Sequence, residues 1–147
     1  MHSEVYAEFS LYSVVNRDFD SSVIATRLGI DPGVAFRVGD AIAGTRRAKR
    51  RDAGWELESS LPRSHALREH VRNVLSLLYP KCALIQELVR QFNLEATMCG
   101  VVYSYNGDRP PLVLEVEEIC QIAELGAGFW IDLYILHDDD EAEDDDG

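Results

Sequence analysis

The sequence predicts an α+β domain, a ferredoxin-like sandwich in which helices cover one face of a mostly antiparallel sheet. Apolar and polar residues alternate over 5–12 and over 129–136, which is the period of a strand with one buried face. From Leu67 to Phe92 apolar residues instead recur every three or four positions, as in helices. Near each end the chain reads strand, polar loop, short helix, Leu-Gly and extended segment. Two such strand–helix–strand units around a central kinked helix or helical hairpin predict this fold.

The first unit begins with the strand at residues 5–12. One face of this strand carries Val5, Ala7, Phe9 and Leu11, and the other carries Tyr6, Glu8, Ser10 and Tyr12. A short helix follows and runs through Leu28. Asp20 or Ser21 can cap it, because their side-chain oxygens accept hydrogen bonds from the first free N–H groups. Residues 31–38 then form a turn and a short extended segment.

The middle of the chain joins the two units. Residues 41–54 show no regular period and contain the basic run RRAKRR at 46–51, so we expect an exposed loop or the tip of a hairpin. A strand resumes directly after it. Pro62 and Ser64 then open the central helical segment, which kinks or restarts at Pro80 because proline lacks the N–H that would continue the helix.

The second unit begins with a strand at residues 96–105, and Asn106-Gly107 then marks a turn. The acidic pair at 117–118 favours the start of a short helix that ends at Leu125, because negative charge is stabilised at a helix N-terminus. The last strand covers residues 129–136. One of its faces carries Phe129, Ile131, Leu133 and Ile135, and the other carries Trp130, Asp132, Tyr134 and Leu136.

Length and charge predict one domain with a tail. A chain of 147 residues fits a single domain, which we place at residues 1–136. Residues 137–147 hold eight acids, and such a block of like charge predicts a disordered tail. The net charge of −12 is mainly a property of this tail, since the rest of the chain has 18 acids and 14 bases.

Cysteines and hydropathy predict a cytoplasmic protein. The three cysteines Cys82, Cys99 and Cys120 have no metal-like spacing and stand among apolar residues, so we expect them reduced and buried. The sequence shows no signal-peptide pattern and no apolar run near the ~20 residues that span a bilayer. The four histidines form no ligand set, and no phosphate-binding loop is present, so we expect no metal and no cofactor.

Several strings together resemble a known family. They are FRVGD, GTRRAKRR, GWELESS, LYPK and the long stretch YSYNGDRPPLVLEVEEICQIAELGAGFWIDLYIL. With these strings, the chain from about Val5 to Leu136 resembles a bacterial domain-of-unknown-function family, the one numbered 4279. The resemblance implies no assigned activity. The small single-domain members of that family look like accessory and immunity-type proteins, which bind a partner without catalysis, and this comparison is by analogy.

The basic run at 46–51 is the first candidate for partner binding. It could contact an acidic protein, lie in solvent against the chain's own acidic tail, or contact phosphate. Direct nucleic-acid binding is disfavoured because the body is acidic even without the tail. Arginine is common at protein interfaces because its planar guanidinium pairs with carboxylates in two places.

Aromatic and acidic residues complete the candidate surface. Trp55 is either a core residue or an anchor at the rim of a cleft beside the basic run. Asp40 either satisfies backbone N–H groups in a turn or orients Arg37 or Arg46 within a pocket. The second face of the last strand would form a patch with Tyr103 and Tyr105 if it lines a groove. The full candidate set is Arg37, Asp40, Arg46, Arg47, Arg50, Trp55, Trp130, Asp132 and Tyr134.

These observations predict a non-catalytic protein-binding module, of the immunity or inhibitor type. We identify no catalytic residue, because no nucleophile is placed beside a base in a recognisable pattern. One alternative is an acidic mimic of nucleic acid that occupies a DNA- or RNA-handling protein. Another is a small-ligand-binding protein or enzyme with a pocket near Trp55. The partner is a protein and not a membrane, and the chain is a monomer or a homodimer.

Overall fold

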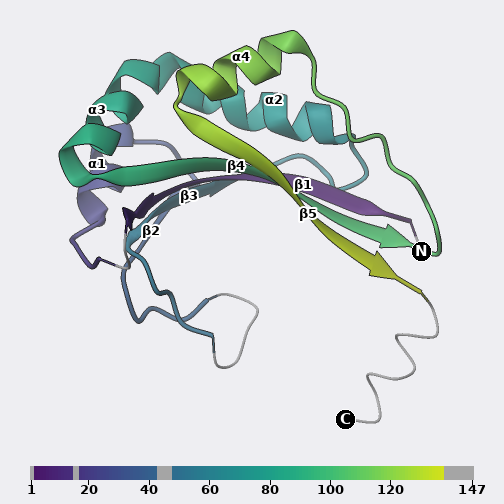
Figure 1. The fold of residues 1–147 in the computed structure, drawn as a ribbon, viewed down its shortest axis with the longest axis horizontal. Coiled ribbons are helices and arrows are strands. Elements are labelled where there is room, and N and C mark those ends of the chain that lie inside the picture. Colours follow the sequence, from purple (N-terminus) through teal and green to yellow (C-terminus); the bar gives the residue numbers. More distant parts are fainter. Residues whose placement is uncertain (1, 15–16, 43–47, 138–147) are drawn as a thin grey trace.

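The computed structural model describes residues 2–14, 17–42 and 48–137. In chain order the elements are β1 (Glu4–Ser13), α1 (Ser22–Leu28), β2 (Val34–Phe36), β3 (Gly54–Glu58), α2 (Leu67–Leu78), the 3-10 turn η2 (Tyr79–Lys81), α3 (Cys82–Phe92), β4 (Leu94–Tyr105), α4 (Val116–Glu124) and β5 (Ala127–Leu136). The predicted α+β class is confirmed, and Figure 1 shows helices on one side of a single sheet.

Within the described residues the sheet has five strands in the order β2-β3-β1-β4-β5. The first four strands of the chain pair antiparallel with one another, in the spatial order β4-β1-β3-β2 of a ferredoxin-like β-α-β-β-α-β fold. β5 is added outside β4 and runs parallel to it, with α4 as the crossover. The ferredoxin-like sandwich therefore gains a fifth strand, which forms one edge of the sheet.

The two strand–helix–strand units differ in how their strands pair. In the first unit β3 lies between β1 and β2, whereas in the second unit β4 and β5 are direct neighbours. Both helices do end as the sequence predicts, because Gly29 (φ 60°) and Gly126 (φ 74°) adopt the left-handed conformation after them. The sequence similarity of the units thus reflects shared local structure, and their strands pair differently.

The central helical segment is one helix with an irregular turn. α2 and α3 are joined by η2, which contains Pro80, so the predicted kink is confirmed. The helix begins at Leu67, a few residues after the expected opening at Pro62 and Ser64. The carboxylate of Glu69 accepts a hydrogen bond from the Ala66 N–H (3.0 Å), which caps the first turn.

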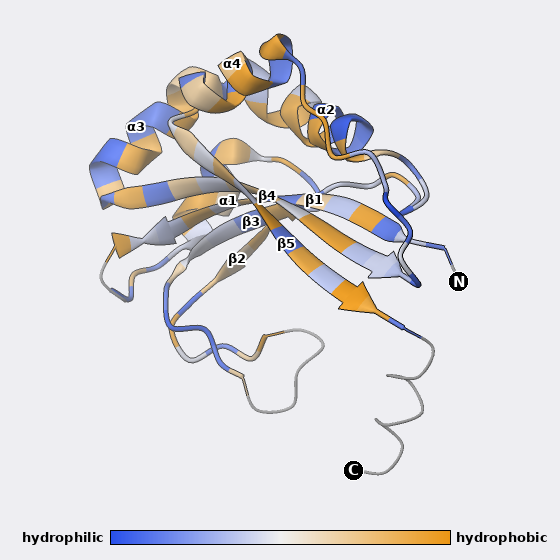
Figure 2. Cartoon of the chain, turned by 45° about the vertical axis from the view of Figure 1, so that its right-hand side comes forward, coloured by the Kyte–Doolittle hydropathy of each residue, from blue (hydrophilic) through white to orange (hydrophobic). Residues whose placement is uncertain are grey.

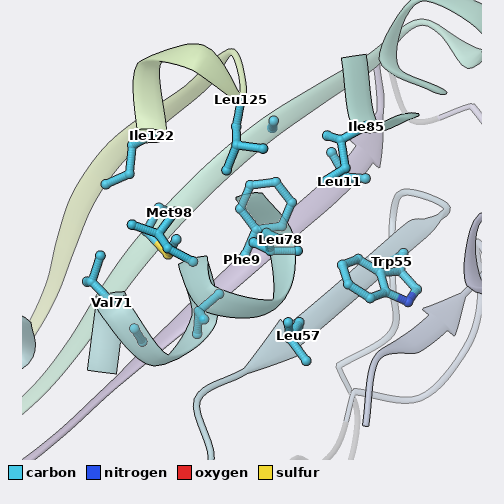
Figure 3. Close-up of a cluster of buried hydrophobic side chains, with 14 of the residues drawn as sticks. Phe9, Leu11, Trp55, Leu57, Val71, Leu78, Ile85, Met98, Ile122 and Leu125 are labelled. Carbon is cyan, nitrogen blue, oxygen red and sulfur yellow. The ribbon is translucent and has the colours of Figure 1, made fainter. Parts of the chain in front are cut away.

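The core lies between the helices and one face of the sheet. Phe9 and Leu11 of β1 and Met98 of β4 have no exposed surface, and they pack with side chains of α2, α3 and α4 (Figure 3). These strand residues belong to the apolar faces that alternation predicts. The opposite face of the sheet has no helix over it within the described chain (Figure 1).

Two further expectations concern cysteines and membranes. The three cysteines are free, but Cys120 on α4 is exposed, so the expectation that all three are buried was wrong. Cys120 lies on the side of α4 that faces away from the core. The buried residues of this helix, Glu118 and Ile122, lie on its other side. No helix in the described part of the chain has the length and apolar character that crossing a membrane needs. Of the predicted tail at 137–147, residues 138–147 lie outside the described residues.

Candidate functional site

The face of the sheet without helices, called the open face here, carries the polar half of each alternating strand. β1 presents Tyr6, Glu8, Ser10 and Tyr12 to it, β4 presents Thr97, Cys99, Val101 and Tyr103, and β5 presents Trp130, Asp132 and Tyr134. The register of β4 and β5 sets Cys99 beside Trp130 and Tyr103 beside Tyr134. Side chains from strands far apart in sequence therefore share one surface.

The described parts of the segment between β2 and β3, residues 37–42 and 48–53, form an arm on this side of the sheet (Figure 1). Two backbone hydrogen bonds join its two limbs. The Gly39 N–H donates to the Arg50 carbonyl (2.8 Å), and the Arg50 N–H donates to the Asp40 carbonyl (2.7 Å). Ala41 and Lys49 form a further antiparallel bridge. These contacts agree with the predicted hairpin. Arg46 and Arg47 lie outside the described residues.

A groove of about 890 Å³ lies between the arm and the open face. Its floor is formed by β1 and β4, and its walls are formed by β5, the end of β2 and the arm. The floor includes Glu8, Ser10, Tyr12, Thr97 and Cys99, and the walls include Trp130, Phe36 and the run from Ala48 to Asp52. Of the predicted site residues, the structure brings Arg50 and Trp130 together here.

Arg50 fastens the arm to the sheet. Its guanidinium lies 2.6 Å from a carboxylate oxygen of Glu56 on β3, and its Cζ lies 4.1 Å above the centre of the Phe36 ring. Both side chains of the ion pair are about four-fifths buried, at 23% and 22% exposed. Arg50 is held by these contacts. Lys49 and Arg51 are exposed instead, so their charged groups can contact a ligand in the groove.

Glu8 gives the floor a titratable group near neutral pH. Its pKa is raised to about 7, chiefly by burial and also by the carboxylates of Glu56 and Glu58. Glu58 lies directly opposite Glu8 in the register of β1 and β3. Burial also raises the pKa of the Cys99 thiol, which disfavours the reactive thiolate at this position.

An aromatic patch extends the open face beyond the groove. The rings of Tyr103 and Tyr134 stack with centroids 4.9 Å apart, and the Tyr134 hydroxyl donates a hydrogen bond to Asp132 (2.9 Å). The prediction that Trp130, Asp132 and Tyr134 share a face is confirmed by the register. Trp130 is 53% exposed and Tyr134 is 42% exposed, so both are available for contact.

Arg37 and Asp40 stand at the base of the arm and do not line the groove. The guanidinium of Arg37 binds Asp18 through two hydrogen bonds (2.7 and 3.3 Å). The carboxylate of Asp40 accepts a hydrogen bond from the Arg37 N–H (2.9 Å). Asp40 therefore satisfies the backbone of a turn and binds the Arg37 N–H instead of its guanidinium. The other half of the alternative, that Asp40 orients Arg46, concerns a residue outside the described part of the chain.

Trp55 is a core residue, so its prediction as a partner-binding anchor was wrong. It has no exposed surface and points to the helix side of β3 (Figure 3). The strand alternates, so Trp55 faces the core while Glu56 faces the groove. Gly33 lies against the indole so closely that a Cβ there would collide with it. The groove is consequently on the other face of the sheet from the pocket that we expected near Trp55.

Sequence reasoning missed Glu8, Thr97 and Cys99 as site residues. Alternation had placed Glu8 on the polar face of its strand. The missing information was the pairing of β1 with β3 and β4, which sets Glu58 opposite Glu8 and brings Thr97 beneath the arm. Register depends on contacts across the whole sheet, and a single strand does not reveal it.

Residues 3–136 match the family described as domain of unknown function, DUF4279. The chain belongs to this family. The DUF4279 match covers every strand and helix of the structure, and it ends where β5 ends. No curated protein and no solved structure matches the DUF4279 chain. In the described part of this DUF4279 domain, no three histidine, cysteine or acidic side chains are placed to hold a metal ion.

Proposed function

We propose that this DUF4279 protein is a non-catalytic protein-binding module of bacterial cytoplasm, of the immunity or inhibitor type. A segment of the partner protein would lie in the groove between the arm and the open face. The observation that supports this most is the groove itself, which is lined by the exposed side chains of Trp130, Lys49 and Arg51. An inhibitor of this type acts by covering its target and needs no chemistry of its own.

The composition of the groove is that of a protein interface. Exposed tryptophan, tyrosine and arginine carry much of the binding energy in such interfaces, because they bury large areas and pair with carboxylates. Lys49 and Arg51 on the arm favour an acidic segment of the partner. The Tyr103–Tyr134 stack continues the surface along β5 and would extend the contact beyond the groove.

The test is affinity capture from a lysate of the source organism, with the wild-type protein and single variants side by side. Trp130→Ala and Arg51→Glu change two walls of the groove. Arg90→Glu on α3 is the matched control, because it reverses the same charge at an exposed position of the helix layer. We expect one protein to be retained in stoichiometric amount by the wild type and by Arg90→Glu, and to be lost from both groove variants.

Two results would contradict the proposal. Equal retention of that protein by Trp130→Ala and Arg51→Glu would place the binding surface elsewhere. Retention of no protein by the wild type would contradict the protein-binding function itself. Circular dichroism of each variant establishes first that it is folded, so that lost binding does not reflect lost structure.

A small-ligand-binding function is the second candidate, and one specific observation favours it. The groove volume of about 890 Å³ falls within the usual range for small-molecule sites, and its floor holds a carboxyl group with a pKa of about 7. A ligand that binds only the folded state raises the melting temperature. A metabolite panel should then contain a compound that stabilises the wild type and does not stabilise Trp130→Ala.

A further inference from the structure

The outer strand β5 (Ala127–Leu136) has two features that favour its pairing with a further strand. It pairs with β4 on one side only, so every second residue directs its N–H and C=O groups away from the sheet. Its side chains are also unusually exposed for apolar residues. The exposed fractions are 38% for Phe129, 50% for Leu133 and 62% for Ile135, and Figure 2 shows the C-terminal end of β5 mostly in the hydrophobic colour.

Features that normally protect an edge strand are missing from β5. Edge strands usually carry lysine or proline, contain a bulge or are very short. β5 has ten residues in unbroken register with β4, and its one charged side chain, Asp132, is hydrogen-bonded to Tyr134. The opposite edge of the sheet, β2, has only three residues. The two edges therefore differ strongly in their capacity to add a strand.

We propose that β5 pairs antiparallel with β5 of a second copy of this chain, which joins the two sheets into one homodimer. This inference does not rest on the proposed function. A twofold axis through Ile131 sets Phe129 opposite Leu133 of the second copy, and it sets Trp130 opposite Asp132. An axis through Leu133 sets Ile131 opposite Ile135 in the same way. On the face that carries Phe129, Ile131, Leu133 and Ile135 both registers match apolar side chains with apolar side chains, and neither sets the two Asp132 carboxylates directly opposite each other.

Charge favours the antiparallel arrangement. The eight acids at 138–147 follow directly after the end of β5 in the chain. Antiparallel pairing starts the two acidic tails at opposite ends of the interface, whereas parallel pairing would start them side by side and repel the subunits. A second copy also always supplies the same unprotected strand, at the same concentration. The charge pattern thus favours the antiparallel arrangement, in which the apolar residues of one β5 also match those of the other.

The test measures the mass of the full chain in solution by sedimentation velocity over a concentration series. The wild type should reach twice the 16.5 kDa mass of one chain. Leu133→Lys and Ile135→Lys should sediment as monomers, because a lysine at the edge would be buried without a partner in the pair. Val34→Lys is the matched control, since Val34 is 56% exposed on the opposite edge strand β2. This control should remain a dimer.

Each other outcome overturns the proposal. A wild-type protein that stays monomeric at the highest concentration that remains clear would show that β5 does not pair with a second copy. A dimer that persists in both lysine variants would place the interface elsewhere. Because Leu133 and Ile135 are at least half exposed, the variants should fold, and an unchanged circular dichroism spectrum checks this point. Two different residues guard against a local defect in either one.

Discussion

The ionisation of Glu8 makes the stability of this fold depend on pH. In the unfolded chain its carboxyl ionises near its ordinary pKa of 4.5, whereas in the folded protein it ionises only near 7. The folded state therefore keeps a proton that the unfolded state has already lost. The stability that this proton contributes is fully present below pH 4.5 and is lost as pH rises through 7.

Replacing Glu8 with glutamine should remove this dependence. At pH 8 we expect Glu8→Gln to raise the free energy of unfolding by about 2 kcal/mol, a value below the full shift because solvent screens a half-buried carboxylate. At pH 4 the two proteins should differ little. Urea unfolding at both pH values measures this, with Glu117→Gln on α4 as an exposed carboxylate removed elsewhere. Equal differences at pH 4 and pH 8 would contradict the account of Glu8.

The two tryptophans should behave in opposite ways when they are truncated. Trp55→Ala leaves a cavity in the core and should lower the free energy of unfolding by about 3–5 kcal/mol. Trp130→Ala removes a half-exposed side chain and should cost less than about 1 kcal/mol. Chemical unfolding followed by circular dichroism compares them. Similar costs for both would refute the assignment of Trp55 to the core and Trp130 to the groove.

At the scale of elements, the arm should be separable from the fold. Its described limbs are held by their own backbone bridges and by Arg50, and none of the described residues 37–42 and 48–52 belongs to the hydrophobic core cluster. Replacing residues 42–48 with Asn-Gly would close the hairpin with a tight turn and keep the Ala41–Lys49 bridge. We expect a change in unfolding free energy below about 1 kcal/mol and weaker partner capture, because the groove loses Ile42 and Ala48 from its wall.

An arm-shortened protein that captures its partner with unchanged affinity would show that residues 42–48 do not belong to the binding surface. One that unfolds would show that the arm supports the sheet more than its contacts indicate. Circular dichroism and the capture assay on the same preparation separate these two cases.

The elements that could be predicted are those whose sequence shows a regular period or a local break. The faces of β1 and β5 followed from alternation, and the break in the central helix followed from Pro80, because both are local properties. The groove could not be predicted in the same way. It needs β1 between β3 and β4, with the arm folded under them, and these are long-range pairings. Trp55 shows the limit, since its position beside the basic run in sequence concealed that its side chain points to the opposite face.

At the scale of the whole molecule, charge separates two accounts of binding. Without the eight acids of 138–147 the net charge falls from −12 to −4. If the groove carries the binding, a chain truncated after His137 should retain the captured partner with little change in affinity. If the protein instead mimics nucleic acid, truncation should cause a large loss, and wild-type binding should weaken steeply with salt. Titration of the captured partner at low and high ionic strength decides between them.

The central claim is that the open face beneath the arm contacts a protein partner, and photo-crosslinking in cells tests it most directly. A benzophenone-bearing phenylalanine replaces Tyr12 on the groove floor in one strain and Tyr79 on the helix layer in another, so that both probes substitute a tyrosine. We predict that light produces a discrete adduct with one other protein at Tyr12 and none at Tyr79. The absence of an adduct at Tyr12, or the same adduct at both positions, would contradict the claim.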